Sequence, residues 1–186
     1  MLLMFDEVQT GFARTGEWFA WQHHFDSKGD VRPDVVTMAK ALGNGVPIGA
    51  IWAKREVAQA FQPGDHATTY GGQPLATSAA RAVLRIMEAI DAPSLAREAG
   101  DQLMGKLLQV PNVIDTRGLG LLIAAEIDTE QVGMTGPEIA LACLKAGLVV
   151  NGISPTAIRL APPLTVSTDE IDEAMEKLSV VLEGDS

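Results

Sequence analysis

The first forty residues contain two short apolar runs, each followed closely by a single charged residue. Leu2–Phe5 ends at Asp6, and Val35–Met38 is followed, after one alanine, by Lys40. Apolar runs of this length between polar or glycine-rich segments are typical of buried parallel strands. In open α/β sheets the chemistry takes place beyond the carboxyl ends of such strands. We therefore expect Asp6 and Lys40 to lie at one edge of a sheet.

Helical periodicity begins further along the chain. Apolar residues recur at helical spacing from Leu75 to Ile90, and Pro74 occupies a first-turn position where proline is tolerated. A second helix is predicted over Ser94–Leu108, with Ser94 as its N-cap. Elsewhere the pattern predicts short helices at 18–25 and 55–61, strands at 48–53, 113–116, 121–127, 148–150 and 158–160, and helices at 136–145 and 169–182, the last capped by Ser167 or Thr168.

This order of elements predicts an α/β protein with a boundary near residue 110. Residues 1–73 are expected to be the end of a large α/β domain, 74–109 interdomain helices, and 110–186 a small α+β domain. A parallel strand needs neighbours on both sides, and the first strand starts almost at Met1. The sequence is therefore expected to be a piece of something larger.

Composition narrows the class of protein. The 186 residues are 47% hydrophobic and 20% charged, with a net charge of -10, which argues against nucleic acid or an anionic membrane as a partner. No apolar stretch has the length of a membrane span. The single cysteine, Cys143, indicates a reducing compartment and a cytoplasmic protein. The three histidines lack partners at ligand spacing, so no metal site is expected.

A lysine and a carboxylate beyond neighbouring strands suit one cofactor in particular, pyridoxal phosphate (PLP). A PLP enzyme needs a lysine for the Schiff base and a carboxylate that keeps the pyridine nitrogen protonated, so that the ring can accept electrons. Taken alone, a lysine such as Lys40 is more often a surface residue, and an aspartate such as Asp6 is more often a turn residue.

Five motifs carry a family resemblance that decides between these alternatives. DEVQTGFARTG, MAKALGNGVPIGA, TTYGGQPLA, RGLGLLIAAEI and IRLAPPLT occur in the order seen in the class III (subgroup II) PLP-dependent aminotransferases. The sequence most resembles the acetylornithine aminotransferases among them, over the C-terminal half of a family member. The resemblance implies fold type I, with a large mixed-sheet domain, a small C-terminal domain and a homodimer.

The resemblance assigns roles to residues around the first two strands. Lys40 is the Schiff-base lysine and then the general base that moves the substrate proton. Asp6 holds the pyridine nitrogen, Val8 packs on the ring, and Gln9 hydrogen-bonds near the ring oxygen. Glu7 points the other way if the stretch is extended, and it receives no catalytic role.

Two further roles follow from the later motifs. Thr69 matches a threonine that reaches the phosphate of the other subunit's cofactor, so each active site would be shared between two chains. Arg159 matches the arginine that clamps the α-carboxylate of glutamate or 2-oxoglutarate, for which a planar guanidinium is suited. Without the resemblance, Thr69 is an ordinary turn residue and Arg159 a strand-end arginine paired with a carboxylate.

The implied function is transamination of a terminal amine, N-acetylornithine, with 2-oxoglutarate as acceptor in arginine biosynthesis. Ornithine, 4-aminobutyrate and other ω-amino acids stay open as donors. A different hypothesis also stays open, namely a non-catalytic fragment or a partner-dependent remnant of such an enzyme. It rests on the phosphate cradle, the ring-stacking aromatic residue and a second substrate arginine, for which the sequence offers no candidates.

Overall fold

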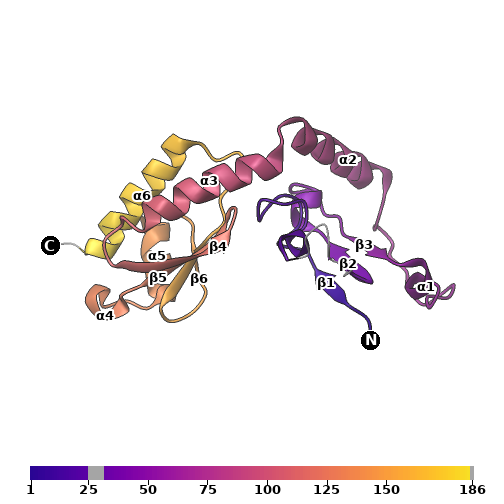
Figure 1. Ribbon diagram of the computed structural model, residues 1–186, viewed down its shortest axis with the longest axis horizontal. Coiled ribbons are helices and arrows are strands. Elements are labelled where there is room, and N and C mark those ends of the chain that lie inside the picture. Colours follow the sequence, from indigo (N-terminus) through magenta and orange to yellow (C-terminus); the bar gives the residue numbers. More distant parts are fainter. Residues whose placement is uncertain (25–31, 185–186) are drawn as a thin grey trace. The chain divides into compact units, whose positions relative to one another are not determined.

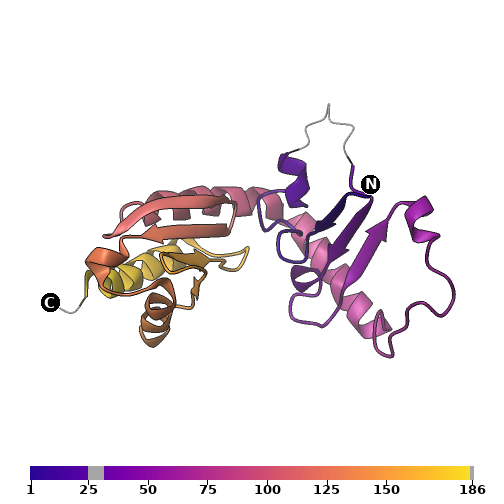
Figure 2. The same cartoon turned by 90° about the horizontal axis from the view of Figure 1, so that it is seen from below.

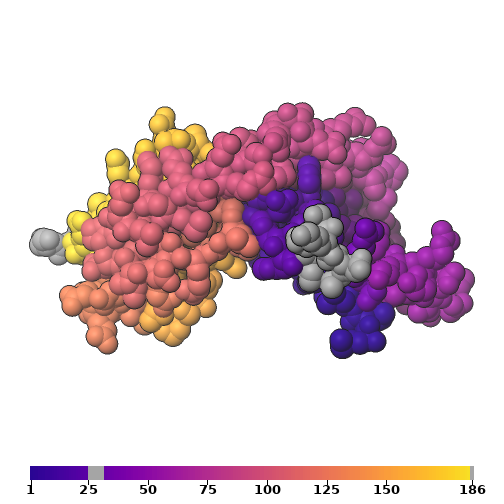
Figure 3. Space-filling view, in the orientation of Figure 1, coloured from indigo at the N-terminus to yellow at the C-terminus, as the bar shows by residue number. Residues whose placement is uncertain are grey.

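The computed structural model divides the chain into two compact units, Met1–Pro93 and Ser94–Ser186. It describes residues 1–24 and 32–184, which are the coloured parts of Figures 1, 2 and 3. The division lies within the interdomain segment, 74–109, that the sequence predicts. We describe each unit by itself.

The first unit is built on a three-stranded sheet in the order β1 (Met4–Asp6), β2 (Val35–Met38) and β3 (Ala50–Ala53). Strands β1 and β2 are parallel, with Asp6 opposite Thr37, and β3 runs antiparallel to β2 (Figure 1). The predicted parallel pairing of the first two apolar runs is therefore confirmed. Lys40 follows β2 by two residues, at the edge of the sheet where Asp6 ends β1.

A long connection leads from β1 to β2. Its described residues include a short 3-10 helix, η1 (Ala20–His23), where the sequence predicts a short helix over 18–25. Phe25, at the end of that predicted helix, lies outside the described residues. The carboxylate of Glu7 accepts hydrogen bonds from the backbone amides of Ala20 and Trp21 at the start of η1. The first residue after β1 thereby holds the middle of the connection in place.

The other helices of the first unit follow its strands. A 3-10 turn, η2 (Lys40–Leu42), follows β2, α1 (Arg55–Ala58) follows β3, and α2 (Pro74–Ala89) carries Pro74 in its first turn as predicted. The predicted helix at 55–61 is thus shorter than expected. At the other end of the sheet, Asp34 forms an ion pair of 2.8 Å with Lys54.

The predicted cap of the next helix is wrong. Helix α3 spans Ala92–Leu107, so Ser94 lies inside its first turn and does not precede it. Pro93 explains the difference, because a proline in the first turn costs no backbone hydrogen bond. The Ser94 hydroxyl instead accepts a hydrogen bond of 2.8 Å from the Arg97 guanidinium.

The second unit contains an antiparallel sheet in the order β4-β5-β7-β6. Its strands are β4 (Val113–Leu119), β5 (Leu122–Ile127), β6 (Asn151–Gly152) and β7 (Ala157–Leu160). The predicted strand at 148–150 is wrong. Gly147, at φ 80°, and Leu148, whose amide donates to the Cys143 carbonyl, still close the preceding helix, so the strand begins later.

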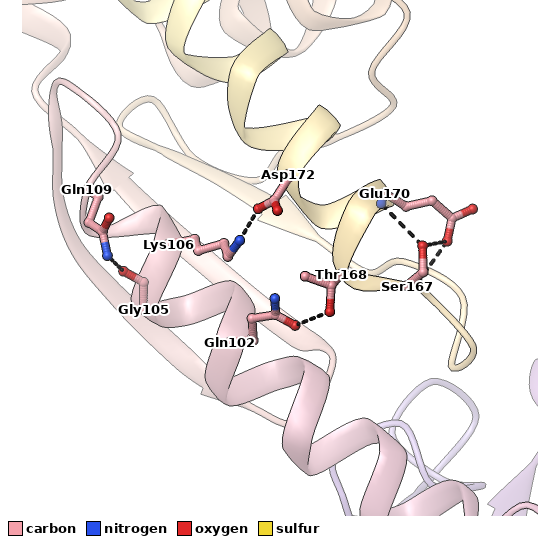
Figure 4. A network of polar contacts seen from close by, with 8 residues as sticks. All are labelled: Gln102, Gly105, Lys106, Gln109, Ser167, Thr168, Glu170 and Asp172. Atoms are coloured by element: carbon pink, nitrogen blue, oxygen red, sulfur yellow. Dashed lines mark hydrogen bonds and ion pairs between the residues drawn. The ribbon is translucent and has the colours of Figure 1, made fainter.

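Three helices of the second unit follow in the chain: α4 (Thr129–Val132), α5 (Gly136–Lys145) and α6 (Thr168–Glu183). Ser167 is the N-cap of α6, as one of the two predicted candidates. Figure 4 shows Ser167 and Glu170 bonded reciprocally, and α3 bonded to α6 through Lys106–Asp172 and Gln102–Thr168. The second unit thus has its own closed core, to which α3 contributes Leu103 and Leu107.

The described residues contain neither a membrane-spanning helix nor a cluster of metal ligands. Within residues 1–24 and 32–184, no helix has both the length and the apolar character needed to cross a membrane. The same residues contain no group of three histidine, cysteine or acidic side chains suited to hold a metal ion.

Candidate active site

Asp6 ends β1 with its carboxylate held on one side only. Its Oδ1 accepts hydrogen bonds from the Val8 amide, at 3.0 Å, and from the Thr37 hydroxyl on the neighbouring strand, at 3.1 Å. Among the described residues nothing is bonded to Oδ2, and the residue is exposed. Asp6 therefore forms the turn expected of an aspartate at a strand end, and it also presents a free, fixed carboxylate oxygen.

Lys40 occupies an unusual backbone conformation. Its φ of 47° lies in the left-handed region, which a residue with a side chain adopts at a cost of about 1–3 kcal/mol. A tight turn follows, in which Gly43 approaches Val46 so closely that a Cβ would lie 2.1 Å from the Val46 carbonyl oxygen. Strained residues of this kind concentrate at functional sites, where the surrounding structure holds them in place.

The side chain of Lys40 extends toward the end of β1. Its Nζ donates a hydrogen bond of 3.2 Å to Oε1 of Gln9, and it is exposed. Lys54 differs, because its ammonium is paired with the Asp34 carboxylate at 2.8 Å. Of these two lysines, Lys40 has only a neutral partner, so its amine is the one better available for chemistry.

The loop that carries Gln9 is fixed by a buried carboxylate. Glu7 is 2% exposed and accepts hydrogen bonds from the Thr10 hydroxyl and from two amides of η1. Its amide also extends the ladder to the Thr37 carbonyl at 3.0 Å. This structural role of Glu7 has no local signature in the sequence, because its partners Ala20 and Trp21 lie thirteen and fourteen residues along the chain.

Thr69 is not brought to this cluster by any hydrogen bond. It lies exposed in the segment before α2, next to a turn in which the Thr68 hydroxyl accepts from the Gly71 amide. A Cβ on Gly71 would lie 2.3 Å from Thr68 Cγ2, so the turn requires glycine there. The structure links Asp6 to Val8 and Gln9 to Lys40 by hydrogen bonds, and no hydrogen bond among the described residues joins Thr69 to them.

Arg159 belongs to the second unit, on β7. Its Nη2 donates a hydrogen bond of 3.3 Å to Asn151 Oδ1 on β6, while its Nε is buried and, within the described residues, without an acceptor. The predicted alternative, a strand arginine neutralised by a carboxylate, is absent from the described part of the chain. A buried donor without a partner is costly, and it favours a site that an anion completes.

Comparisons of the whole chain with known proteins identify its family. Residues 1–182 match the aminotransferase class-III family. The sequence is 43% identical over 182 residues to acetylornithine aminotransferase of Corynebacterium efficiens, and 41% identical over 186 residues to that of Methanothermobacter thermautotrophicus. Each alignment covers 98% of this chain, and the two alignments cover 43% and 45% of the respective relatives. The chain therefore spans less than half the length of these relatives.

Solved structures give the same result for the fold. The ornithine aminotransferase of Toxoplasma gondii, which has partial PLP occupancy at its active site, superposes with a TM-score of 0.83 at 29% identity, over 98% of this chain and 43% of that one. An S-selective transaminase from Arthrobacter sp. gives 0.84 at 28% identity, over 98% and 44%. The predicted α/β class and type I fold are confirmed. The chain belongs to the class-III aminotransferases.

Proposed function

We propose that this chain supplies the lysine side of a PLP-dependent aminotransferase site. One observation carries the proposal. The free amine of Lys40 and the fixed carboxylate of Asp6 lie beyond the ends of adjacent parallel strands, and Gln9 contacts the amine. This is the edge where α/β folds place their chemistry.

The donor set fits the ring end of PLP. Asp6 Oδ2 is an unengaged acceptor suited to a protonated pyridine nitrogen, and the Gln9 amide can bond the ring oxygen. The half-buried Val8 offers an apolar contact for a ring face. Thr69 is assigned to the phosphate of the cofactor in a second copy of the chain, which makes the active species a homodimer. When bound, PLP supplies the electron sink for deprotonation at the substrate's α or terminal carbon.

The protein's own residues then divide the work. Lys40 would hold the cofactor covalently and would move a proton at the carbon that bears the amine. Asp6 keeps the ring nitrogen protonated by its negative charge. Arg159 binds the α-carboxylate of the acceptor with two parallel N–H donors, and its buried Nε supports that role.

The substrates follow from the relatives. The curated relatives quoted above are named acetylornithine aminotransferases, so we propose N-acetylornithine as donor and 2-oxoglutarate as acceptor, in arginine biosynthesis. Ornithine is the second donor to test, because an ornithine aminotransferase is among the similar structures.

Burial raises the pKa of the lone Cys143 thiol to about 11, which suits a thiol that stays reduced in the cytoplasm.

A second candidate is a partner-dependent or non-catalytic remnant. It is favoured by the exposed apolar side chains of the first unit's sheet, such as Met4 and Ile51. Aminotransferase activity is assayed in the 186-residue chain alone and then in a mixture with the N-terminal half of the Corynebacterium efficiens relative. This assay separates a partner-dependent chain from a non-catalytic remnant. Activity only in the mixture supports partner dependence, and activity in neither supports a remnant.

Covalent labelling tests the main proposal. After incubation of the same mixture with PLP and reduction with borohydride, peptide mass mapping is expected to find the pyridoxyl group on Lys40. Lys54→Ala is the matched control and should leave the label unchanged, whereas Lys40→Ala should remove it. A label on Lys54 instead would refute the assignment.

Substrate kinetics test Arg159. Loss of a desolvated bidentate ion pair costs about 2–5 kcal/mol, so Arg159→Ala should weaken use of 2-oxoglutarate and glutamate by roughly a hundredfold in catalytic efficiency. Arg159→Lys should recover only part of this loss, because an ammonium lacks the two-pronged geometry. Unchanged kinetics in both variants would show a purely structural arginine.

A further inference from the structure

The outer face of the second unit's sheet carries two arginines in one row. Arg117 on β4 is paired with Ala124 on β5, Ala124 with Arg159 on β7, and Arg159 with Asn151 on β6. Residues paired across strands direct their side chains to the same face. The two guanidinium groups are therefore separated by one strand that bears only an alanine between them.

A carboxylate on β5 is the diagonal neighbour of both arginines. Glu126 follows Ala124 by two residues on β5, so it shares their face and is the diagonal neighbour of both Arg117 and Arg159. Diagonal neighbours on a sheet lie about 7–8 Å apart, within reach of long side chains. By register alone, Glu126 could pair with either arginine.

The observed contacts distinguish the two arginines clearly. Glu126 Oε2 accepts a hydrogen bond of 2.8 Å from Arg117 Nη1, and the Thr156 hydroxyl donates to Oε1, so both carboxylate oxygens are engaged. Arg159 is bonded instead to Asn151, on the side of β7 away from Glu126. Arg117 is thus bonded to a residue of β5, whereas Arg159 is bonded to a residue of β6.

This separation matters because Arg159 has to stay available. A carboxylate of the same chain competes with a dissolved one at a high effective concentration. If Glu126 turned to Arg159, it would occupy the donors that an incoming carboxylate needs. We propose that Arg117 is a positioning residue, which holds Glu126 away from Arg159 and so keeps Arg159 open to a substrate carboxylate. The proposal rests on the anion-binding role proposed above for Arg159.

Two variants and a control separate this role from simple stabilisation. Arg117→Met keeps an unbranched stem and removes the charge, and the Arg117 side chain is 56% exposed, so folding should be retained. Arg117→Met/Glu126→Gln also removes the competing charge. Asp115→Asn removes another carboxylate of the same face, directly opposite Glu126, and leaves the Arg117–Glu126 pair in place.

The first measurement needs no ligand. In the full 186-residue chain, the NMR signal of the Arg159 Nε–H reports whether a carboxylate approaches it. The signal should shift in Arg117→Met, and it should stay at its wild-type position in the double variant and in Asp115→Asn. An unshifted signal in Arg117→Met would overturn the inference, since Glu126 would then not move to Arg159.

The second measurement uses glutarate, a dicarboxylate, as the probe. Its affinity should fall about two- to fivefold in Arg117→Met, the size expected of an exposed ion pair, and return to the wild-type value in the double variant. A double variant as weak as Arg117→Met would show that Arg117 acts only on the fold. If the wild-type chain does not bind glutarate at all, the role of Arg159 fails, while the signal in the first measurement still decides the role of Arg117.

Discussion

The two units of the chain cover their sheets to very different extents. In the second unit, every other residue of β5 is buried, as Ile123, Ala125 and Ile127 pack against the helices. In the first unit, the strands carry apolar residues of the same kind, yet Met4 is 62% exposed and Ile51 65% exposed. Both sheets thus carry apolar strand residues, but these side chains are buried in the second unit and exposed in the first.

The open sheet is also the one that carries the candidate chemistry. Beside its face is a hollow of about 440 Å³, and its lining includes Trp21, Val36, Met38 and Trp52. Apolar surface that is left uncovered marks a site of association. An apolar run in the sequence therefore identifies a strand, but it does not indicate what covers the strand.

The largest expected contrast is between a buried side chain of the second unit, Leu178, and an exposed one of the first, Ile51. Leu178 on α6 is fully buried, so Leu178→Ala should lower the free energy of unfolding by about 2–5 kcal/mol. Ile51→Ala should change it by less than about 0.5 kcal/mol, because the side chain is mostly exposed. All three tryptophans lie in the first unit, so fluorescence follows that unit, and circular dichroism follows both. A fluorescence midpoint that moves with Leu178→Ala would break the comparison, since the units would then unfold together.

Two glycines of helix α3 give a matched test within the second unit. A Cβ on Gly100 would lie 2.2 Å from the Gly120 carbonyl oxygen, so Gly100→Ala should destabilise by about 1–3 kcal/mol. Gly105 has open space around it, and Gly105→Ala should stabilise by about 0.5–1 kcal/mol. Urea midpoints measure both. Equal effects at the two positions would contradict the close approach of α3 to the β4–β5 turn.

The cap of α6 should make a smaller contribution. Ser167→Ala removes the hydroxyl that accepts from the Glu170 amide, and loss of such a cap costs about 0.5–2 kcal/mol. Ser167→Asn should retain most of the stability because asparagine is also a good cap. The loss should be seen in the circular dichroism midpoint and not in tryptophan fluorescence. A shift of both signals would show that the cap influences the first unit as well.

The smallest effect is expected from acid. Hydrogen bonds from the Ser167 amide and hydroxyl lower the pKa of Glu170 below its ordinary value. Since the folded-state pKa is the lower one, the contribution to stability is present at neutral pH and disappears as the pH falls through the folded-state pKa. Glu170→Gln, which retains an acceptor, should reduce the pH dependence of the urea midpoint below pH 5. An unchanged slope would place the acid sensitivity in other carboxylates.

Local signals in the sequence predicted much of this structure. The apolar runs before Asp6 and Lys40 predicted two parallel neighbours, and the caps and periodicity predicted α2 and α6. The tertiary contacts had no such signal. Glu7 bonds to amides thirteen and fourteen residues away, and the pairing of Glu126 with Arg117 depends on the register of two strands. The left-handed conformation of Lys40 likewise had no signal in the sequence.

That conformation of Lys40 has a consequence for protein engineering. The residue on which the proposed chemistry depends is a poor choice for the backbone at its own position, so selection for stability alone would replace it. Lys40→Gly and Lys40→Asn should both melt higher than Lys40→Ala, because glycine and asparagine tolerate a positive φ better than alanine does. The rise in melting temperature over Lys40→Ala would measure the stability that the protein gives up to hold an amine at this place.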